Sequence, residues 1–249
     1  MQAASDKNDV SGSLLLILEV LLPDSQHVYL AWLLCAFVPW ARAVPEASKK
    51  PKAKAPPTVA ATVAREGIKA NNSETKIVEN AVITLPDIVT TREVIKDQED
   101  ATTSPLKRKK YSALREAQGM AIRRWGVNWR SSVMYTFLVE VMETGEANGM
   151  SRIYPLCVTK LIFEDRQQLV DSYAKWLSRI KELDLLDAPS LKPMVDGKQL
   201  CDALEAQNGP WVKKALDSLI EWQLQNPDET DTDRAIEEVK RRKKEFGPF

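Results

Sequence analysis

A predicted helical corner near the C-terminus holds the residues best suited to binding an anion, in the run from Gly209 to Lys214. Pro210 fits the first position of a helix, because its missing N–H would have no helical partner there anyway. The first N–H groups of a helix carry partial positive charge and can bind an anion. Lys213 follows one turn later, and Lys198 lies in the short helix predicted before the corner. This pattern is typical of an anion site, although any helical hairpin also needs a glycine and a proline at its turn.

Two further groups of cations fall in a helix predicted from Ser104 to Trp125. Arg123 and Arg124 lie near its end. Its first turn holds a basic run of four residues, Lys107, Arg108, Lys109 and Lys110. Cations at that end of a helix each cost roughly a few tenths of a kcal/mol. A bound polyanion would offset this cost, while a nuclear-localisation signal or a solvated surface accounts equally for the run.

The side chains that nucleotide transfer requires are not recognisable. That chemistry needs two carboxylates holding Mg²⁺ beside a glycine-rich phosphate loop. The sequence has no Gly-Gly pair, and no strand pattern that would carry the carboxylates. Asp87 is isolated, and the acidic pairs Glu99-Asp100 and Glu237-Glu238 fall in solvated charge clusters.

The composition favours an all-α protein. Glycine is scarce, at 9 of 249 residues, and leucine, alanine, glutamate and lysine are common. Basic and acidic residues number 35 each, so any binding of nucleic acid depends on local patches. The cysteines Cys35, Cys157 and Cys201 are far apart and His27 is the only histidine, which leaves no plausible zinc site. Unpaired thiols are typical of a reducing, intracellular compartment.

Hydrophobic periodicity and loop residues divide the chain into four parts. Residues 1–44 hold the first body helices after a frayed N-terminus, and residues 45–57 form a linker rich in proline, lysine and alanine. Residues 58–187 form a helical body. Residues 188–249 form a helical tail that contains the hairpin and a basic end. We therefore expect a multi-helical body followed by a C-terminal helical hairpin and tail.

Two apolar stretches, Leu14–Leu22 and Val28–Trp40, are shorter than the ~20 residues that a membrane-spanning helix needs. A proline turn divides them, and no positive cluster precedes them as it would in a signal peptide. The stretches therefore predict two buried core helices.

Helical spacing also assigns individual side chains to faces. Pro86 is expected to end one helix and start another. Arg115 falls on the solvent side of its helix. Trp125 and Trp129, at a predicted corner, are typical of core residues, although they would also suit stacking on a base. Trp211 is expected to face the core of the hairpin.

Three stretches of the sequence carry a family resemblance. They are Tyr29–Trp40 (YLAWLLCAFVPW), Ala121–Gly126 (AIRRWG), and the pattern of Gly197, Leu200, Gly209, Pro210, Trp211, Trp222, Gln223, Leu224, Asn226 and Pro227. In this order they resemble the C-terminal region of tRNA nucleotidyltransferases, the CCA-adding enzymes, especially the fungal type. The similarity runs from about Leu14 to about Val239, whereas the Arg-rich neck motif of that family is absent.

The resemblance implies the tRNA-binding body and tail of such an enzyme, without its catalytic head and inactive alone. Mg²⁺ and CTP or ATP would bind only to the missing head. The partner would be tRNA rather than DNA or a membrane, gripped at its phosphates by shape. The implied contacts are backbone N–H groups at Gly209, Trp211 and Val212 and the side chains of Lys107, Arg108, Lys109, Lys110, Arg123, Arg124, Lys198, Lys213 and Lys214.

Two other function classes stay open. One is a helical protein-interaction scaffold without an RNA role, and the other is a membrane-associated protein that uses residues 14–40. Mitochondria, nucleus and cytoplasm all suit the CCA-adding interpretation.

Overall fold

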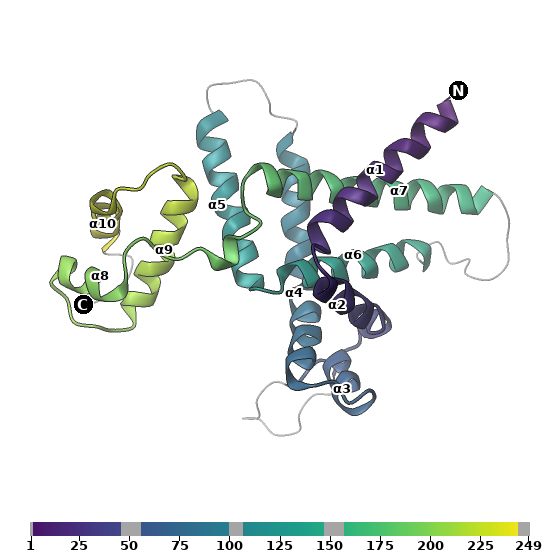
Figure 1. Ribbon diagram of the computed structural model, residues 1–249, viewed down its shortest axis with the longest axis horizontal. Coiled ribbons are helices and arrows are strands. Elements are labelled where there is room, and N and C mark those ends of the chain that lie inside the picture. Colours follow the sequence, from purple (N-terminus) through teal and green to yellow (C-terminus); the bar gives the residue numbers. More distant parts are fainter. Residues whose placement is uncertain (1, 46–55, 100–106, 147–156, 244–249) are drawn as a thin grey trace. The chain divides into compact units, whose positions relative to one another are not determined.

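The protein is all-α. The computed structural model describes residues 2–45, 56–99, 107–146 and 157–243, which form ten α-helices and two short 3-10 helices and contain no strand. These helices fall into two compact units (Figure 1). The first unit comprises residues 1–100 and 125–182, and the second comprises residues 101–124 and 183–249. The second unit is thus discontinuous in sequence, because it includes a helix that precedes most of its other residues by about sixty positions.

The first unit is built around one central helix. Its elements are α1 (Gln2–Leu21), α2 (Ser25–Cys35), η1 (Val38–Trp40), α3 (Val59–Glu66), α4 (Asn72–Glu99), α6 (Trp129–Glu146) and α7 (Cys157–Glu182). The central helix α6 packs against α1, α2, α4 and α7, while α1 also lies along α7 and α3 along α4 (Figure 1).

Aromatic side chains fill the core of this unit. Tyr173 contacts the rings of Phe137 and Trp176 edge-on, and Trp176 in turn contacts Trp125. Trp125 and Trp129 are both buried, which confirms the core position expected for them. The indole N–H of Trp125 donates to Asp87 at 2.7 Å, so this carboxylate has a structural partner.

The structure corrects three expectations for this unit. Helix α1 begins at Gln2, within the segment expected to be frayed. Helix α4 continues through Pro86, because Leu85 and Ile88 are buried on either side of it and packing outweighs the local cost of the proline. The apolar stretch Val28–Trp40 is not core throughout, since Trp32 leaves 75% of its surface exposed.

No single helix in the described ranges has both the length and the apolar character to cross a membrane. The pair Ser11–Leu21 and Ser25–Cys35 meets that test only when taken together, and it is bent by 106°.

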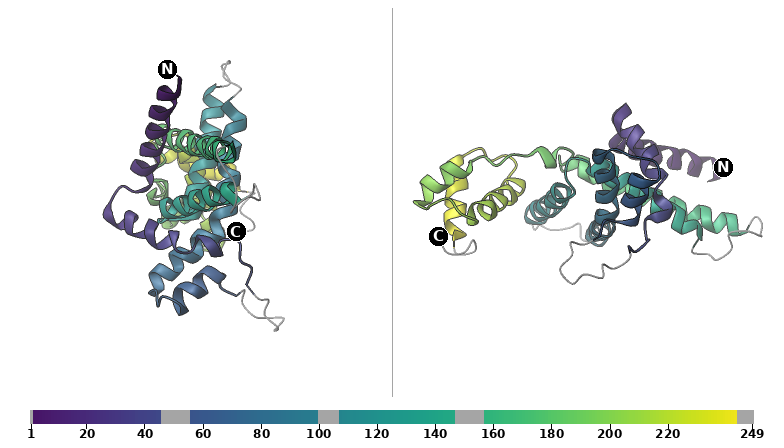
Figure 2. Two further views of the ribbon diagram at one scale, coloured as in Figure 1. Left: turned by 90° about the vertical axis from the view of Figure 1, so that its right-hand side faces the viewer. Right: turned by 90° about the horizontal axis from the view of Figure 1, so that it is seen from below.

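The second unit joins one long helix to a C-terminal helical group. Its elements are α5 (Lys107–Trp125, except for its last residue), η2 (Ala188–Ser190), α8 (Gly197–Leu204), α9 (Trp211–Gln225) and α10 (Thr232–Arg241). Helices α8, α9 and α10 pack on one another, as the right-hand view of Figure 2 shows. Their shared core contains Leu200, Trp211, Leu219 and Val239.

A buried arginine ties α5 to the rest of this unit. Arg115 donates from Nε to the carbonyl oxygen of Leu183 at 2.8 Å and from Nη1 to that of Leu224 at 3.1 Å. The expectation that Arg115 faces solvent is therefore wrong, because helical spacing alone does not reveal carbonyl groups that come from distant residues. One turn further on, a Cβ at Gly119 would lie 2.7 Å from the side chain of Leu224, so a larger residue there would require that side chain to shift.

Candidate nucleic-acid interface

Two helix starts adjoin at the predicted hairpin of the second unit. A Cβ added to Gly197, the first residue of α8, would lie 3.0 Å from Cγ1 of Val212 at the start of α9. Lys198 follows Gly197 in α8, and Lys213 and Lys214 follow Val212 in α9. All three lysine side chains are exposed. The structure therefore presents three predicted cations at two neighbouring helix starts, which we call the lysine corner: Lys198, Lys213 and Lys214.

Trp211 fixes the shape of this corner from the inside. Its side chain is only 4% exposed, which confirms the prediction that it faces the core. The indole N–H donates to the carbonyl oxygen of Gln207 at 2.8 Å, which ties the ring to the chain before the helix. A Cβ at Gly209 would lie 3.1 Å from this ring, so a larger residue would be crowded there. Trp211 and Gly209 thus position the lysines, and the indole ring is not available to stack on a ligand.

The backbone N–H groups at the corner are less available than predicted. The N–H of Val212 donates to the carbonyl oxygen of Gly209 at 3.1 Å. At the start of α8, Asp196 and Gln199 form a reciprocal capping box, in which Asp196 Oδ1 accepts from the Gln199 N–H at 2.8 Å. A carboxylate already occupies that helix start. Attraction for an anion therefore comes mainly from the lysine side chains.

The two arginines near the end of α5 differ in their surroundings. Arg123 is half-buried, and its Nη1 donates to the carbonyl oxygens of Leu191 at 2.5 Å and Ala188 at 3.1 Å. These bonds hold the turn that leads into α8, so Arg123 has a structural role whether or not it contacts a ligand. Arg124 is exposed.

The basic run Lys107–Lys110 forms the start of α5, but its side chains lie outside the described part of the structure. The basic end of α10 is better defined. Arg241 and Arg242 both donate to Glu238, and these bonds lower the pKa of that carboxyl. Arg241 and Arg242, two cations of the predicted basic end, are therefore paired with a carboxylate of α10.

The sequence contains one Asp-x-Asp spacing, a pattern typical of metal sites, at Asp231 and Asp233, and sequence reasoning overlooked it. Asp231 caps α10 by accepting from the N–H of Asp233 at 2.9 Å, and it also lies 3.8 Å from Arg234. Across the described ranges, no three His, Cys, Asp or Glu side chains are grouped closely enough to hold a metal ion.

The chain is related in sequence to proteins named nucleotidyltransferases. It is 33% identical to nucleotidyltransferase lcsQ of Purpureocillium lilacinum over 92% of this chain and 40% of that protein. It is 23% identical to tRNA nucleotidyltransferase cca1 of Schizosaccharomyces pombe, over 84% of this chain and 36% of the relative. It is 26% identical to the mitochondrial CCA tRNA nucleotidyltransferase of Saccharomyces cerevisiae, over 70% of this chain and 27% of the relative.

The chain thus spans less than half the length of these curated relatives. No protein-family model matches the chain, and no solved structure matches it.

Sequence reasoning missed one exposed feature of the first unit. Val28, Tyr29 and Trp32 lie on the outer side of α2, although the stretch was expected to be core. The sequence did contain a signal for this exposure. Apolar residues occur on all sides of this helix, whereas a helix with one buried side needs apolar residues on that side alone.

Proposed function

We propose that this chain is the tRNA-binding helical part of a nucleotidyltransferase of the CCA-adding type. The main support is its similarity to two proteins named as tRNA nucleotidyltransferases, over 84% and 70% of this chain. The relative named lcsQ shares more residues and is named only as a nucleotidyltransferase, so the experiment below measures binding to tRNA itself. We assign Mg²⁺ and the nucleotide to the portion of those proteins that has no counterpart here. We place the protein inside the cell, in mitochondria, nucleus or cytoplasm.

The lysine corner is the surface that we assign to the RNA. Lys198, Lys213 and Lys214 are exposed on neighbouring helices, and the buried Trp211 holds their backbone in place. Three ammonium groups on a rigid frame suit the phosphates of a folded RNA, which a protein contacts by shape rather than by base sequence. Arg124 and the run Lys107–Lys110 belong to the same unit and are further candidates for contact with RNA.

A salt series tests this assignment. Lys213→Gln together with Lys214→Gln should weaken tRNA binding and reduce the slope of log K against log salt by up to ~2, because up to two phosphate contacts no longer release counterions. The loss should be similar for different tRNAs, since phosphate contacts carry no sequence information. Binding is measured by fluorescence anisotropy with labelled tRNA.

Lys76→Gln together with Lys175→Gln is the matched control. It removes the same two charges from exposed sites on α4 and α7 of the first unit. Equal slopes for the corner variant and the wild type would remove the hairpin from the RNA surface. Equal losses in both variants would mean that only net charge matters. No binding of the wild type to tRNA at low salt would contradict the proposed function itself.

A further inference from the structure

Exposed apolar side chains lie on α1 and α2, two consecutive helices of the first unit. They are Leu14, Leu15, Val28, Tyr29 and Trp32, and we call them the N-terminal apolar face. Trp32 is 75%, Leu15 63% and Tyr29 53% exposed. Single apolar residues on a surface are ordinary, but Val28, Tyr29 and Trp32 lie within one turn of α2, and exposed tryptophan and tyrosine together are typical of a binding surface.

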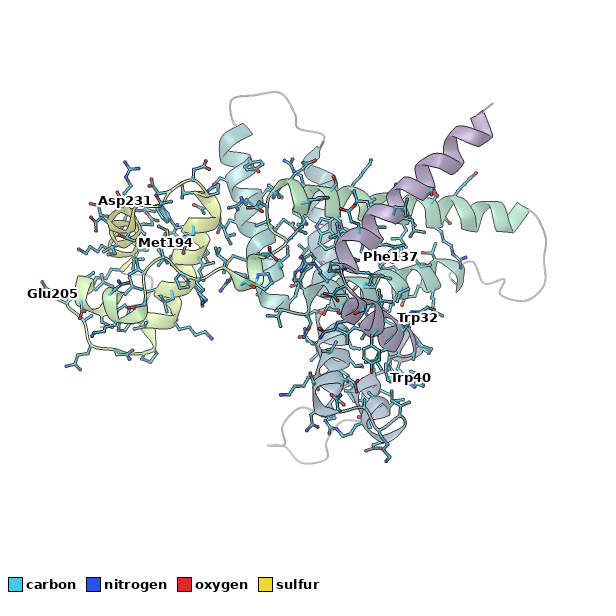
Figure 3. All side chains as sticks on the ribbon, in the orientation of Figure 1. Trp32, Trp40, Phe137, Met194, Glu205 and Asp231 are labelled. Carbon is cyan, nitrogen blue, oxygen red and sulfur yellow. The ribbon has the colours of Figure 1, made fainter. Side chains whose placement is uncertain are left out.

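The face is rigidly held. On the opposite side of α2, Leu30, Ala31 and Leu34 are buried in the core, so the helix cannot turn its outer residues inward. The hydroxyl of Tyr29 donates to Glu74 of α4 at 2.5 Å. This bond fixes the ring and lowers the pKa of Glu74. A preorganised aromatic group gives up little side-chain freedom when a partner binds. Figure 3 labels Trp32 on this helix.

Charge distinguishes between a protein and a lipid as the occupant. From Ser11 to Cys35 the charged side chains are Glu19 and Asp24, with no lysine or arginine. Peripheral helices that bind anionic membranes combine an apolar side with lysine or arginine at its edge, because these cations are attracted to the anionic headgroups. The N-terminal apolar face lacks this feature and resembles the apolar centre of a protein interface, where charged residues are depleted.

We propose that the N-terminal apolar face docks the part of a nucleotidyltransferase that has no counterpart in this chain. This inference rests on the proposed function. The chain spans 40% of lcsQ, so more than half of that relative is available to cover a surface that this chain leaves exposed. The occupant is therefore a polypeptide with an apolar patch that receives Trp32 and Leu15.

The test uses the part of lcsQ that lies outside the similarity, produced as a separate tagged protein. This chain carries a built-in reporter, because Cys35 is exposed on α2 one turn after Trp32. Cys157→Ser and Cys201→Ser leave Cys35 as its only thiol. We expect the lcsQ segment to bind this chain and to slow maleimide labelling of Cys35 at least about tenfold. We expect Trp32→Ser with Leu15→Ser to weaken binding at least about tenfold, as truncation of interface anchors does.

Ile83→Ser is the matched control, since Ile83 on α4 has the same exposed fraction as Leu15, 63%. It should leave both binding and labelling unchanged. Unfolding curves of the variants alone should match the wild type, which separates loss of docking from loss of folding. Failure of the segment to bind, unchanged binding of the double variant, or equal loss with Ile83→Ser would each overturn the inference.

Two other occupants give distinct results. Trp32-dependent dimerisation of the chain in sedimentation would identify a second copy as the occupant. Trp32-dependent flotation with vesicles of phosphatidylcholine and phosphatidylserine would identify lipid. Either result overturns the proposed docking. Binding of tRNA by the chain alone is measured separately, so the docking proposal and the proposed function fail independently.

Discussion

Helices α2 and α9 both carry tryptophan, but they place it in opposite environments. Trp211 of α9 is 4% exposed and its N–H is bonded, whereas Trp32 of α2 is 75% exposed. On α9 the apolar residues lie in adjoining stripes, and polar residues that include Lys213 and Lys214 occupy the rest of the helix. On α2 they surround the helix, so some must face outward whichever side is buried. The comparison shows that the arrangement of apolar residues, rather than their number, decides which tryptophan supports the fold and which is free to meet a partner.

Truncating each of the two tryptophans should give the largest difference in the free energy of unfolding that we expect. Trp211→Ala should lower the free energy of unfolding by roughly 3–5 kcal/mol, because it opens a cavity in the core of the second unit. Trp32→Ala should change it by less than about 0.5 kcal/mol, as exposed substitutions generally do. Urea unfolding followed by far-UV circular dichroism measures both values. Comparable losses in the two variants would mean that α2 is covered in solution.

A second test concerns how each unit satisfies its buried carbonyl groups. In the second unit the charged side chain of Arg115 donates hydrogen bonds to the carbonyl oxygens of Leu183 and Leu224. Arg115→Met keeps most of the apolar bulk but leaves these carbonyls unpaired, so we expect a loss of about 2–3 kcal/mol. Arg42→Met is the control, because Arg42 forms an exposed pair with Glu143 at 2.8 Å that is worth at most about 1 kcal/mol. A loss no larger than the control's would contradict the structural role of Arg115.

In the first unit a neutral hydroxyl group donates to a buried carbonyl oxygen. The stability of this unit should therefore depend on pH in the alkaline range. The hydroxyl of the buried Tyr135 donates to the carbonyl oxygen of Phe37 at 3.1 Å. Burial raises the pKa of Tyr135 from 10.0 to about 12. Between these values the unfolded chain loses the proton first, so the stability present below pH 10 is lost as the pH rises toward 12.

Tyr135→Phe tests this sensitivity and carries the smallest effect. It should cost about 1 kcal/mol at neutral pH through the lost hydrogen bond. Its stability should then decline less steeply than that of the wild type above pH 10. A residual decline is expected from Tyr173, whose pKa burial also raises. Parallel curves of unfolding free energy against pH would show that Tyr135 does not contribute to the loss of stability above pH 10.

The lysine corner could be predicted from the sequence because local signals define it. Asp196 and Gly197 mark the start of α8, and Gly209 with Pro210 marks the turn before α9. These residues act within a few positions of themselves, so turn and capping rules apply directly. The helical fold class followed from periodicity in the same way.

The features that escaped prediction depend on residues far away in the chain. Arg115 can be buried because its guanidinium donates hydrogen bonds to carbonyl oxygens that lie 68 and 109 positions later in the sequence. Pro86 remains inside α4 because the neighbouring side chains are packed against other helices. Trp32 is exposed because α2 packs against the core through only one of its sides. Periodicity identifies a helix, but it does not indicate which of several apolar sides meets the rest of the protein.

The discontinuous composition of the second unit has a consequence for synthesis on the ribosome. The surface of α5 around Arg115 is complete only when Leu224 has been made, 109 residues later. At about 5–20 residues per second, this interval lasts about 5–20 s, during which Arg115 and Gly119 lack their contacts with Leu224. The first unit has by then received all of its own helices. The nascent chain therefore passes through a stage with one unit complete and α5 uncovered, and a chaperone would recognise it at that helix.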